Sequence, residues 1–160
     1  MPTLAEFNQM SSQSQASLLV GIYPGLSGLD KTSGPFANLE SLYQALREAV
    51  DSAPSEVRTA LLYGHPELGI TNLAGESQRE QAGAGLMELN PDERSELIQL
   101  NRDYRERFGF PFILAVKGKN PRQILAALRQ RLANSREQEE LTAWSEIHKI
   151  AWFRLQERVQ

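Results

Sequence analysis

Apolar residues recur every three or four positions through most of this chain, and this spacing limits the fold more than any other feature of the sequence. Such a period places side chains on one face of an α-helix, whereas a half-buried strand alternates apolar and polar residues. Alternating runs rich in β-branched residues are nearly absent. The sequence therefore predicts an all-α fold, a single-domain helical bundle over residues 1–160, and the 41% hydrophobic content is sufficient for a core.

Asparagine marks three of the expected helix starts. Asn38 precedes an apolar stripe at helical spacing and is a plausible N-cap. Asn90 and Asn120 are each followed by proline, which suits the first helical position. These two signals predict helices over about 91–107 and 121–134.

A further helix is expected to hold Pro54 in its first turn and to run to Leu62. Gly64 and the pair His65-Pro66 stop it, because a proline pushes the residue before it out of the α region. His65 is therefore expected at a helix end. A long terminal helix is expected from about residue 136 to about residue 158.

Two stretches do not follow the helical period. Residues 21–37 are rich in Gly, Ser and Pro and are expected to form a long loop, a kind of segment that is usually functional or mobile. The compact apolar run 108–118 contains the one strand-like piece, residues 112–116. By its length this piece is either an extended segment or a short buried helix.

The composition excludes several classes of function. A formal charge of −3 and scattered Lys and Arg provide no basic surface for nucleic acid. The absence of cysteine and the presence of two distant histidines argue against a metal site. The N-terminal segment MPTLAEFNQM does not resemble a signal peptide, and no apolar run is long enough to cross a membrane. We therefore expect a metal-free, cytoplasmic protein that has no membrane segment.

His65 is the first candidate for chemistry. A lone histidine at a helix terminus is more often a capping or packing residue than a catalyst. An imidazole nevertheless titrates near neutral pH, where a small environmental change makes it suitable for proton transfer.

The second candidate is the segment around Ser77 and Glu80. Ser77-x-x-Glu80 precedes an apolar stripe and reads as a capping box, so structure alone explains both residues. The functional alternative is that Ser77, Glu80 and Gln81 surround a helix N-terminus, which suits an anionic ligand.

The third candidate is Arg154. At 100° per residue it shares a helix face with the apolar residues Ile147, Ile150 and Ala151. A guanidinium that faces a core requires an anionic partner, either a structural carboxylate such as Glu80 or the carboxylate of a ligand.

Three ordered segments resemble the 2-oxo-4-hydroxy-4-carboxy-5-ureidoimidazoline (OHCU) decarboxylases of the route from urate to allantoin. They are HPELG at 65–69, SQREQAGAGL at 77–86 and LNRDYRERFGFPFILAVKG at 100–118, and the last is the most specific. The resemblance extends from about Asn38 to Leu155. It implies an all-helical, cofactor-free lyase of purine metabolism that converts OHCU to (S)-allantoin and carbon dioxide.

The resemblance also implies roles for individual residues. The histidine of the family's His-Pro motif corresponds to His65 as the catalytic acid, with Pro66 at the substrate. Glu80 falls in the family's Ser-x-x-Glu-Gln substrate motif, and we expect it to be the second catalytic residue, because it would orient His65 or the ureido group. The remaining residues implied in substrate binding are Ser77, Gln81, Phe112, Ile113, Leu114, Ala115, Val116 and Arg154.

We expect the imidazole, the Glu80 carboxylate and the Arg154 guanidinium to converge on one small pocket. The resemblance implies a small-molecule ureide as the binding partner. The family is frequently dimeric, so a homodimer is expected, and association with other urate-pathway enzymes is a further expectation.

The N-terminal part, about residues 1–37, departs from the family pattern. No site residue is therefore assigned before His65, and the departure leaves the exact ureide open. The alternative function is a non-catalytic helical module that has the family fold and binds a ureide or interacts with another partner. Retention of His65, Glu80 and Arg154 together argues against that alternative, because a scaffold does not need all three.

Overall fold

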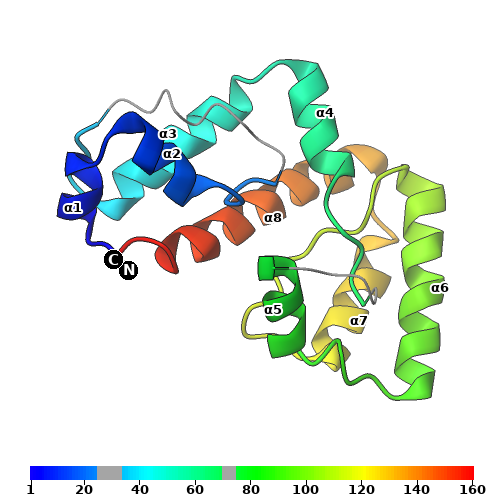
Figure 1. Ribbon diagram of the computed structural model, residues 1–160. Coiled ribbons are helices and arrows are strands. Elements are labelled where there is room, and N and C mark those ends of the chain that lie inside the picture. Colours follow the sequence, from blue (N-terminus) through cyan, green and yellow to red (C-terminus); the bar gives the residue numbers. More distant parts are fainter. Residues whose placement is uncertain (25–33, 70–74) are drawn as a thin grey trace. The chain divides into compact units, whose positions relative to one another are not determined.

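The computed structural model describes residues 1–24, 34–69 and 75–160, and the centre of the expected loop at 21–37 lies outside these ranges. The described chain is helical and contains no strand in these ranges, which confirms the all-α prediction (Figure 1). The helices are α1 (Leu4–Gln9), α2 (Ser12–Leu19), α3 (Leu39–Asp51), α4 (Ser55–Tyr63), α5 (Gly75–Gly83), α6 (Pro91–Phe108), α7 (Pro121–Arg131) and α8 (Arg136–Gln156).

The chain divides into two compact units. Unit 1 contains residues 1–64 and 148–160, and unit 2 contains residues 65–147, so the division falls within α8. Compactness does not establish that either unit folds alone. The expectation of one domain therefore stays a prediction.

Unit 1 joins the two ends of the chain. The backbone N–H of Leu4 donates to the carbonyl of Gln160 at 2.8 Å, and the N–H of Gln160 donates to Pro2 at 3.0 Å. The N and C labels of Figure 1 mark these adjacent ends. The core of this unit is formed by apolar side chains of its helices and of the segment after α2, which include Phe7, Leu19, Ile22, Leu42, Leu46, Val50, Ala151 and Leu155.

Unit 2 is organised around α6 and α7, which pack against each other. Asn90 and Asn120 form reciprocal capping boxes with Glu93 and Gln123, so both predicted starts are confirmed. At the other end of α6, Gly109 adopts φ 84°, a left-handed conformation that favours glycine at a helix C-terminus.

Aromatic rings from the segment 104–112 form the centre of unit 2. Tyr104 lies with its ring centroid 4.6 Å from that of Phe108 and 5.3 Å from that of Phe112. Phe110 contacts the same tyrosine at 5.9 Å. All four side chains are buried, so the FGFPF run serves the core.

The structure corrects several helix boundaries. Pro54 precedes α4 as its N-cap instead of lying in the first turn, and α7 ends at Arg131 rather than near residue 134. The predicted cap at Ser77 is wrong, because α5 already begins at Gly75. Helices α1 and α2 have no counterpart among the predicted elements.

Helix α5 also ends earlier than the apolar stripe indicated. Gly85 adopts φ 80°, and the N–H of Leu86 donates to the carbonyl of Gln81 at 3.0 Å. The N–H of Gly85 donates to Ala82 at 3.0 Å, which completes a Schellman motif. The left-handed glycine therefore stops the helix before Leu89 can join its face.

Among the described helices, none is both long enough and apolar enough to cross a membrane.

Candidate active site

His65 comes directly after Gly64, the C-cap of α4, as predicted from the His-Pro pair. Its side chain is buried, with 6% of its surface exposed, whereas Pro66 is partly exposed. A buried imidazole that begins unit 2 is suited either to packing or to proton transfer in a water-poor site.

The turn that follows Pro66 is held by Gln81 of α5. The Gln81 side-chain oxygen accepts from the N–H of Gly69 at 2.7 Å, and its amide nitrogen donates to the carbonyl of Glu67 at 3.5 Å. The structure therefore brings the expected substrate residue Gln81 to the turn that carries His65 and Pro66. Both of these contacts are with protein backbone, so Gln81 fixes this turn.

Helix α6 holds the same turn from a second direction. Asn101 donates to the carbonyl of Leu68 at 3.0 Å, and Arg105 forms an ion pair with Glu67 at 2.9 Å. Gly69 adopts φ 80°, a conformation that favours glycine, and a β-carbon there would also require the Leu97 side chain to move, because it would lie 2.5 Å from a Leu97 methyl carbon. The conformation of the turn after His65 is thus fixed by contacts with α5 and α6.

Ser77 and Glu80 lie on α5, and both are partly exposed. Ser77 is the third helical residue and Glu80 the sixth, so the pair occupies the first two turns instead of the cap. The positions remain compatible with a ligand near this end of α5, and the catalytic role of Glu80 stays a prediction.

Residues 112–116 belong to no helix or strand, so a short buried helix is excluded. All five side chains are buried. The carbonyl of Ile113 accepts from Arg131, and the carbonyl of Val116 accepts from Lys119. Across the described ranges, by contrast, the backbone N–H and C=O groups of Leu114 and Ala115 form no hydrogen bond with another residue.

Buried backbone groups are nearly always paired in folded proteins, by protein, water or ligand. Two adjacent residues whose N–H and C=O groups have no partner in the described chain are therefore suited to a ligand that carries both donors and acceptors. A ureide has this pattern, with alternating N–H and C=O groups.

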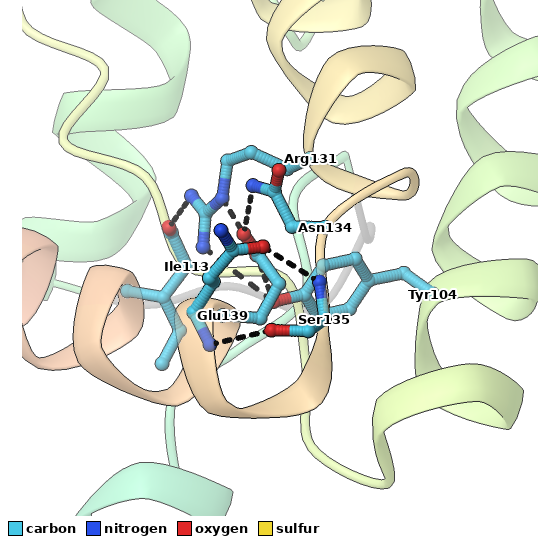
Figure 2. A network of polar contacts seen from close by, with 7 residues as sticks. Tyr104, Ile113, Arg131, Asn134, Ser135 and Glu139 are labelled. Atoms are coloured by element: carbon cyan, nitrogen blue, oxygen red, sulfur yellow. Dashed lines mark hydrogen bonds and ion pairs between the residues drawn. The ribbon is translucent and has the colours of Figure 1, made fainter.

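A buried polar network lies beside this segment (Figure 2). Glu139, at 0% exposure, accepts from Arg131 at 2.8 Å and from the hydroxyl of Tyr104 at 2.6 Å. Its second oxygen accepts from Asn134 at 2.8 Å. Burial, and then the hydrogen bond to Glu139, raise the pKa of Tyr104, so this hydroxyl remains a donor.

Arg154 lies in unit 1. It is buried, as the helical wheel predicts, and so are the side chains of Ile147, Ile150 and Ala151. Its guanidinium donates to the backbone carbonyl of Gly21 at 2.9 Å. A backbone carbonyl is thus one of its partners. Because Arg154 and His65 belong to different units, their convergence stays a prediction.

Sequence reasoning missed the second histidine, His148. Its Nδ1 lies 2.7 Å from the hydroxyl of Tyr23, and its Nε2 lies 3.2 Å from a carboxylate oxygen of Asp51. Tyr43 donates to the backbone carbonyl of His148 at 2.7 Å. Burial lowers the pKa of His148, and Arg47 adds to that effect.

Within the described ranges, no three His, Asp or Glu side chains are grouped so as to hold a metal ion.

Comparisons with known proteins identify the family. Residues 8–156 match the model of a family described as OHCU decarboxylase. The chain belongs to the OHCU decarboxylase family. The 2-oxo-4-hydroxy-4-carboxy-5-ureidoimidazoline decarboxylase of Haloferax volcanii is 39% identical over 160 residues, which cover 98% of this chain and 95% of that relative. The family prediction made from the three segments is confirmed.

This chain is also similar to parts of longer proteins. The uric acid degradation bifunctional protein of Bacillus sp. (strain TB-90) is 38% identical over 98% of this chain, which spans only 32% of that relative. A crystal structure of (S)-allantoin synthase matches with a TM-score of 0.80 at 28% identity, over 98% of this chain and 54% of the other.

A second solved structure is an OHCU decarboxylase crystallised in the presence of (S)-allantoin. It matches with a TM-score of 0.68 at 25% identity, over 92% of this chain and 97% of the other. The helical fold is therefore that of the OHCU decarboxylase family.

Proposed function

We propose that this protein catalyses the decarboxylation of OHCU to (S)-allantoin and carbon dioxide in urate degradation, and that His65 mediates a stereospecific proton transfer. The observation that carries the proposal is the family match over residues 8–156, together with a Haloferax volcanii decarboxylase of similar extent. The three sequence segments that gave the resemblance lie within this match.

The reaction requires no external electron sink. The bond between the ring and the carboxyl carbon breaks, and its electron pair passes into the adjacent ring C=N as carbon dioxide leaves. A proton is then added to one face of the planar intermediate. Because OHCU also decays unaided to racemic allantoin, the enzyme must supply position and handedness as well as speed.

His65 is the proposed proton donor to that face. Its burial supports this role, because a proton donor screened from bulk water acts on one face of the intermediate only. Glu80 orients His65 or the ureido group, and Ser77 and Pro66 contact the substrate. Gln81 fixes the turn after Pro66. It also helps to hold the ring amides of the substrate.

The segment 112–116 is the proposed site for the amide groups of the ureide. Support comes from the backbone groups of Leu114 and Ala115, which have no hydrogen-bond partner elsewhere in the described ranges. Hydrogen bonds from these groups discriminate strongly, since an analogue lacking a donor or acceptor would leave a buried group unpaired. Arg154 is proposed to anchor a substrate oxygen.

The test is to add the protein to freshly generated OHCU and to follow the circular dichroism of the product. Wild type should produce an (S)-allantoin signal faster than unaided decay, and His65→Asn should reduce both the rate and the optical purity. His148→Asn is the matched control, because it makes the same substitution at the other histidine and should retain optical purity. A His65→Asn variant with wild-type rate and handedness would end the assignment.

We also infer association with other enzymes of the urate pathway, and self-association as a homodimer. The bifunctional Bacillus relative supports the first inference, because a domain similar to this chain is there joined covalently to further sequence. Light scattering after size exclusion tests self-association, and a mass of about 36 kDa, twice the 18.0 kDa of one chain, is expected.

A further inference from the structure

We propose that Arg131, held in place by Glu139, is a positioning residue that sets the conformation of the substrate segment 112–116. The inference rests on the proposed function, because it assigns to Arg131 control over a segment proposed to bind the ureide. Arg131 acts through the backbone of Ile113 and the ring of Phe112, not through direct contact with the substrate.

The segment needs an external support. A strand is held by a ladder of hydrogen bonds and a helix by bonds to residues four positions away, and residues 112–116 have neither. Within the described chain, their backbone hydrogen bonds are those to Arg131 and Lys119. The bond from Lys119 closes a turn at the end of the segment, so Arg131 supplies the tie near its beginning.

Arg131 contacts two consecutive residues of the segment. One guanidinium nitrogen donates to the carbonyl of Ile113 at 2.5 Å, and the guanidinium carbon lies 4.4 Å from the centroid of the Phe112 ring. A planar, rigid fork suits this combination of hydrogen bonding and stacking, which a flexible ammonium cannot reproduce. Arg131 therefore restrains both the backbone and a side chain.

Glu139 fixes the guanidinium itself. A cation that is 7% exposed requires a nearby anion, and Glu139 receives the Arg131 Nε at 2.8 Å. The carboxylate is in turn oriented by Tyr104 and Asn134, as Figure 2 shows. Donors on α6, on α7 and in the turn before α8 thus converge on one acceptor, which leaves Arg131 few alternative positions.

The catalytic consequence concerns handedness. If residues 112–116 hold the ring amides, they decide which face of the planar intermediate receives the proton. A looser segment would bind substrate less tightly and would present both faces. A purely structural Arg131 would instead change only the fraction of folded protein.

The principal test is Arg131→Lys, which retains the charge and removes the fork. We expect kcat/KM to fall by roughly tenfold to a hundredfold, mainly through a higher KM, because small displacements of binding groups have effects of this size. The optical purity of allantoin should fall at enzyme concentrations where catalysed conversion exceeds unaided decay. Thermal-shift stabilisation by (S)-allantoin should weaken as well.

Arg129→Lys is the matched control. It makes the same substitution one half-turn earlier on α7, where Arg129 is 52% exposed and bonds Glu96. Wild-type KM and optical purity are expected. Tyr104→Phe gives a graded test within the network, since it removes one donor to Glu139 and one partner of the Arg131 guanidinium but leaves the bond from Arg131 to Ile113. It should change KM and optical purity in the same direction as Arg131→Lys, but by less.

If Arg131→Lys does not fold at the assay temperature, Glu139→Gln carries the test, because it keeps the shape of the side chain and removes the charge that holds Arg131. The same rise in KM and loss of optical purity are expected. If wild type is active and the folded variant has the KM and optical purity of wild type, the positioning role of Arg131 is overturned. An inactive wild type overturns the proposed function instead, so the two failures are distinguishable.

Discussion

Among the described residues, each unit has a buried polar centre that ties an irregular segment to helices, and these two centres use different chemistry. In unit 1, the ring of His148 forms a hydrogen bond with the hydroxyl of Tyr23, which lies in the segment after α2. In unit 2, the Arg131–Glu139 pair holds Ile113 of the segment after α6. A neutral ring serves the first unit and an ion pair serves the second.

The partners of His148 determine its tautomer. A carboxylate only accepts, so Nε2 carries the proton toward Asp51 and Nδ1 accepts from the hydroxyl of Tyr23. The lowered pKa of His148 agrees with a neutral ring. Burial raises the pKa of Tyr23, which keeps its hydroxyl protonated as the donor.

The difference between the neutral ring and the ion pair determines how much stability is lost when each centre is disrupted. Removing one member of a buried ion pair leaves a charge without compensation, whereas removing one donor from a neutral ring leaves a single unpaired atom. The ion pair is therefore the more damaging centre to break. The neutral ring is the centre that responds to mild acid.

The largest effect is expected from Glu139→Ala. It leaves the Arg131 guanidinium buried without its carboxylate and should destabilise the fold by about 3–5 kcal/mol. Denaturant unfolding measures the change. Glu140→Ala, at the exposed neighbouring position, is the control and should have a small effect. Equal losses in the two variants would show that the pair contributes nothing specific.

A second experiment compares the two buried tyrosines. Tyr104→Phe removes a bond to a carboxylate and should cost about 1.5–3 kcal/mol, whereas Tyr23→Phe removes a bond to a neutral ring and should cost roughly 1 kcal/mol. The substitutions are chemically identical, and both hydroxyls are buried. Unfolding free energies in the reverse order would contradict the contrast between the centres.

The third prediction concerns pH. The folded-state pKa of His148 lies below its ordinary value of 6.5, so the unfolded chain binds the proton more readily. The contribution of His148 to stability is therefore complete above pH 6.5 and is lost as the pH falls from there through the lower folded value. Melting temperatures between pH 7.5 and 5 should decrease more for wild type than for His148→Gln, at about constant ionic strength.

Because both proteins retain His65, the difference between their pH profiles isolates His148. The groups that act on its ring are Arg47, Asp51, Arg58 and Tyr23. Parallel profiles for the two proteins would show that His148 does not sense pH.

The smallest effect is expected from Asp51→Asn. The side chain of Asp51 is 53% exposed, so its hydrogen bond from the neutral His148 ring competes with water and should contribute about 1 kcal/mol or less. Loss of the carboxylate also removes an influence that raises the pKa of His148, so the acid-sensitive range should move to lower pH. A titration of the ring by NMR measures this movement. A shift toward higher pH would contradict it.

Local signals made much of the fold predictable. The starts of α3, α6 and α7 depend on an Asn side chain and the residues that follow it, and all three were predicted. The signal for α1 was also present, because Thr3 and Glu6 form a capping box, but a six-residue helix carries too little periodicity to stand out.

The polar contacts of the candidate site were less predictable. The helical wheel indicated a buried Arg154, yet its backbone partner Gly21 lies 133 positions away in sequence. Tyr23 and His148 are separated by 125 positions. No periodicity connects such pairs, because they are brought together by packing. The resemblance gave the role of Gln81 as substrate binding, whereas its contacts with Glu67 and Gly69 appear only in the folded chain.

The backbone bonds between residues 2, 4 and 160 have a practical consequence for engineering. Since the two ends already meet, a linker of a few residues would turn the chain into a ring with little additional entropic cost. Such a ring could be reopened at an exposed surface turn to give a circular permutant that keeps the contacts of unit 1.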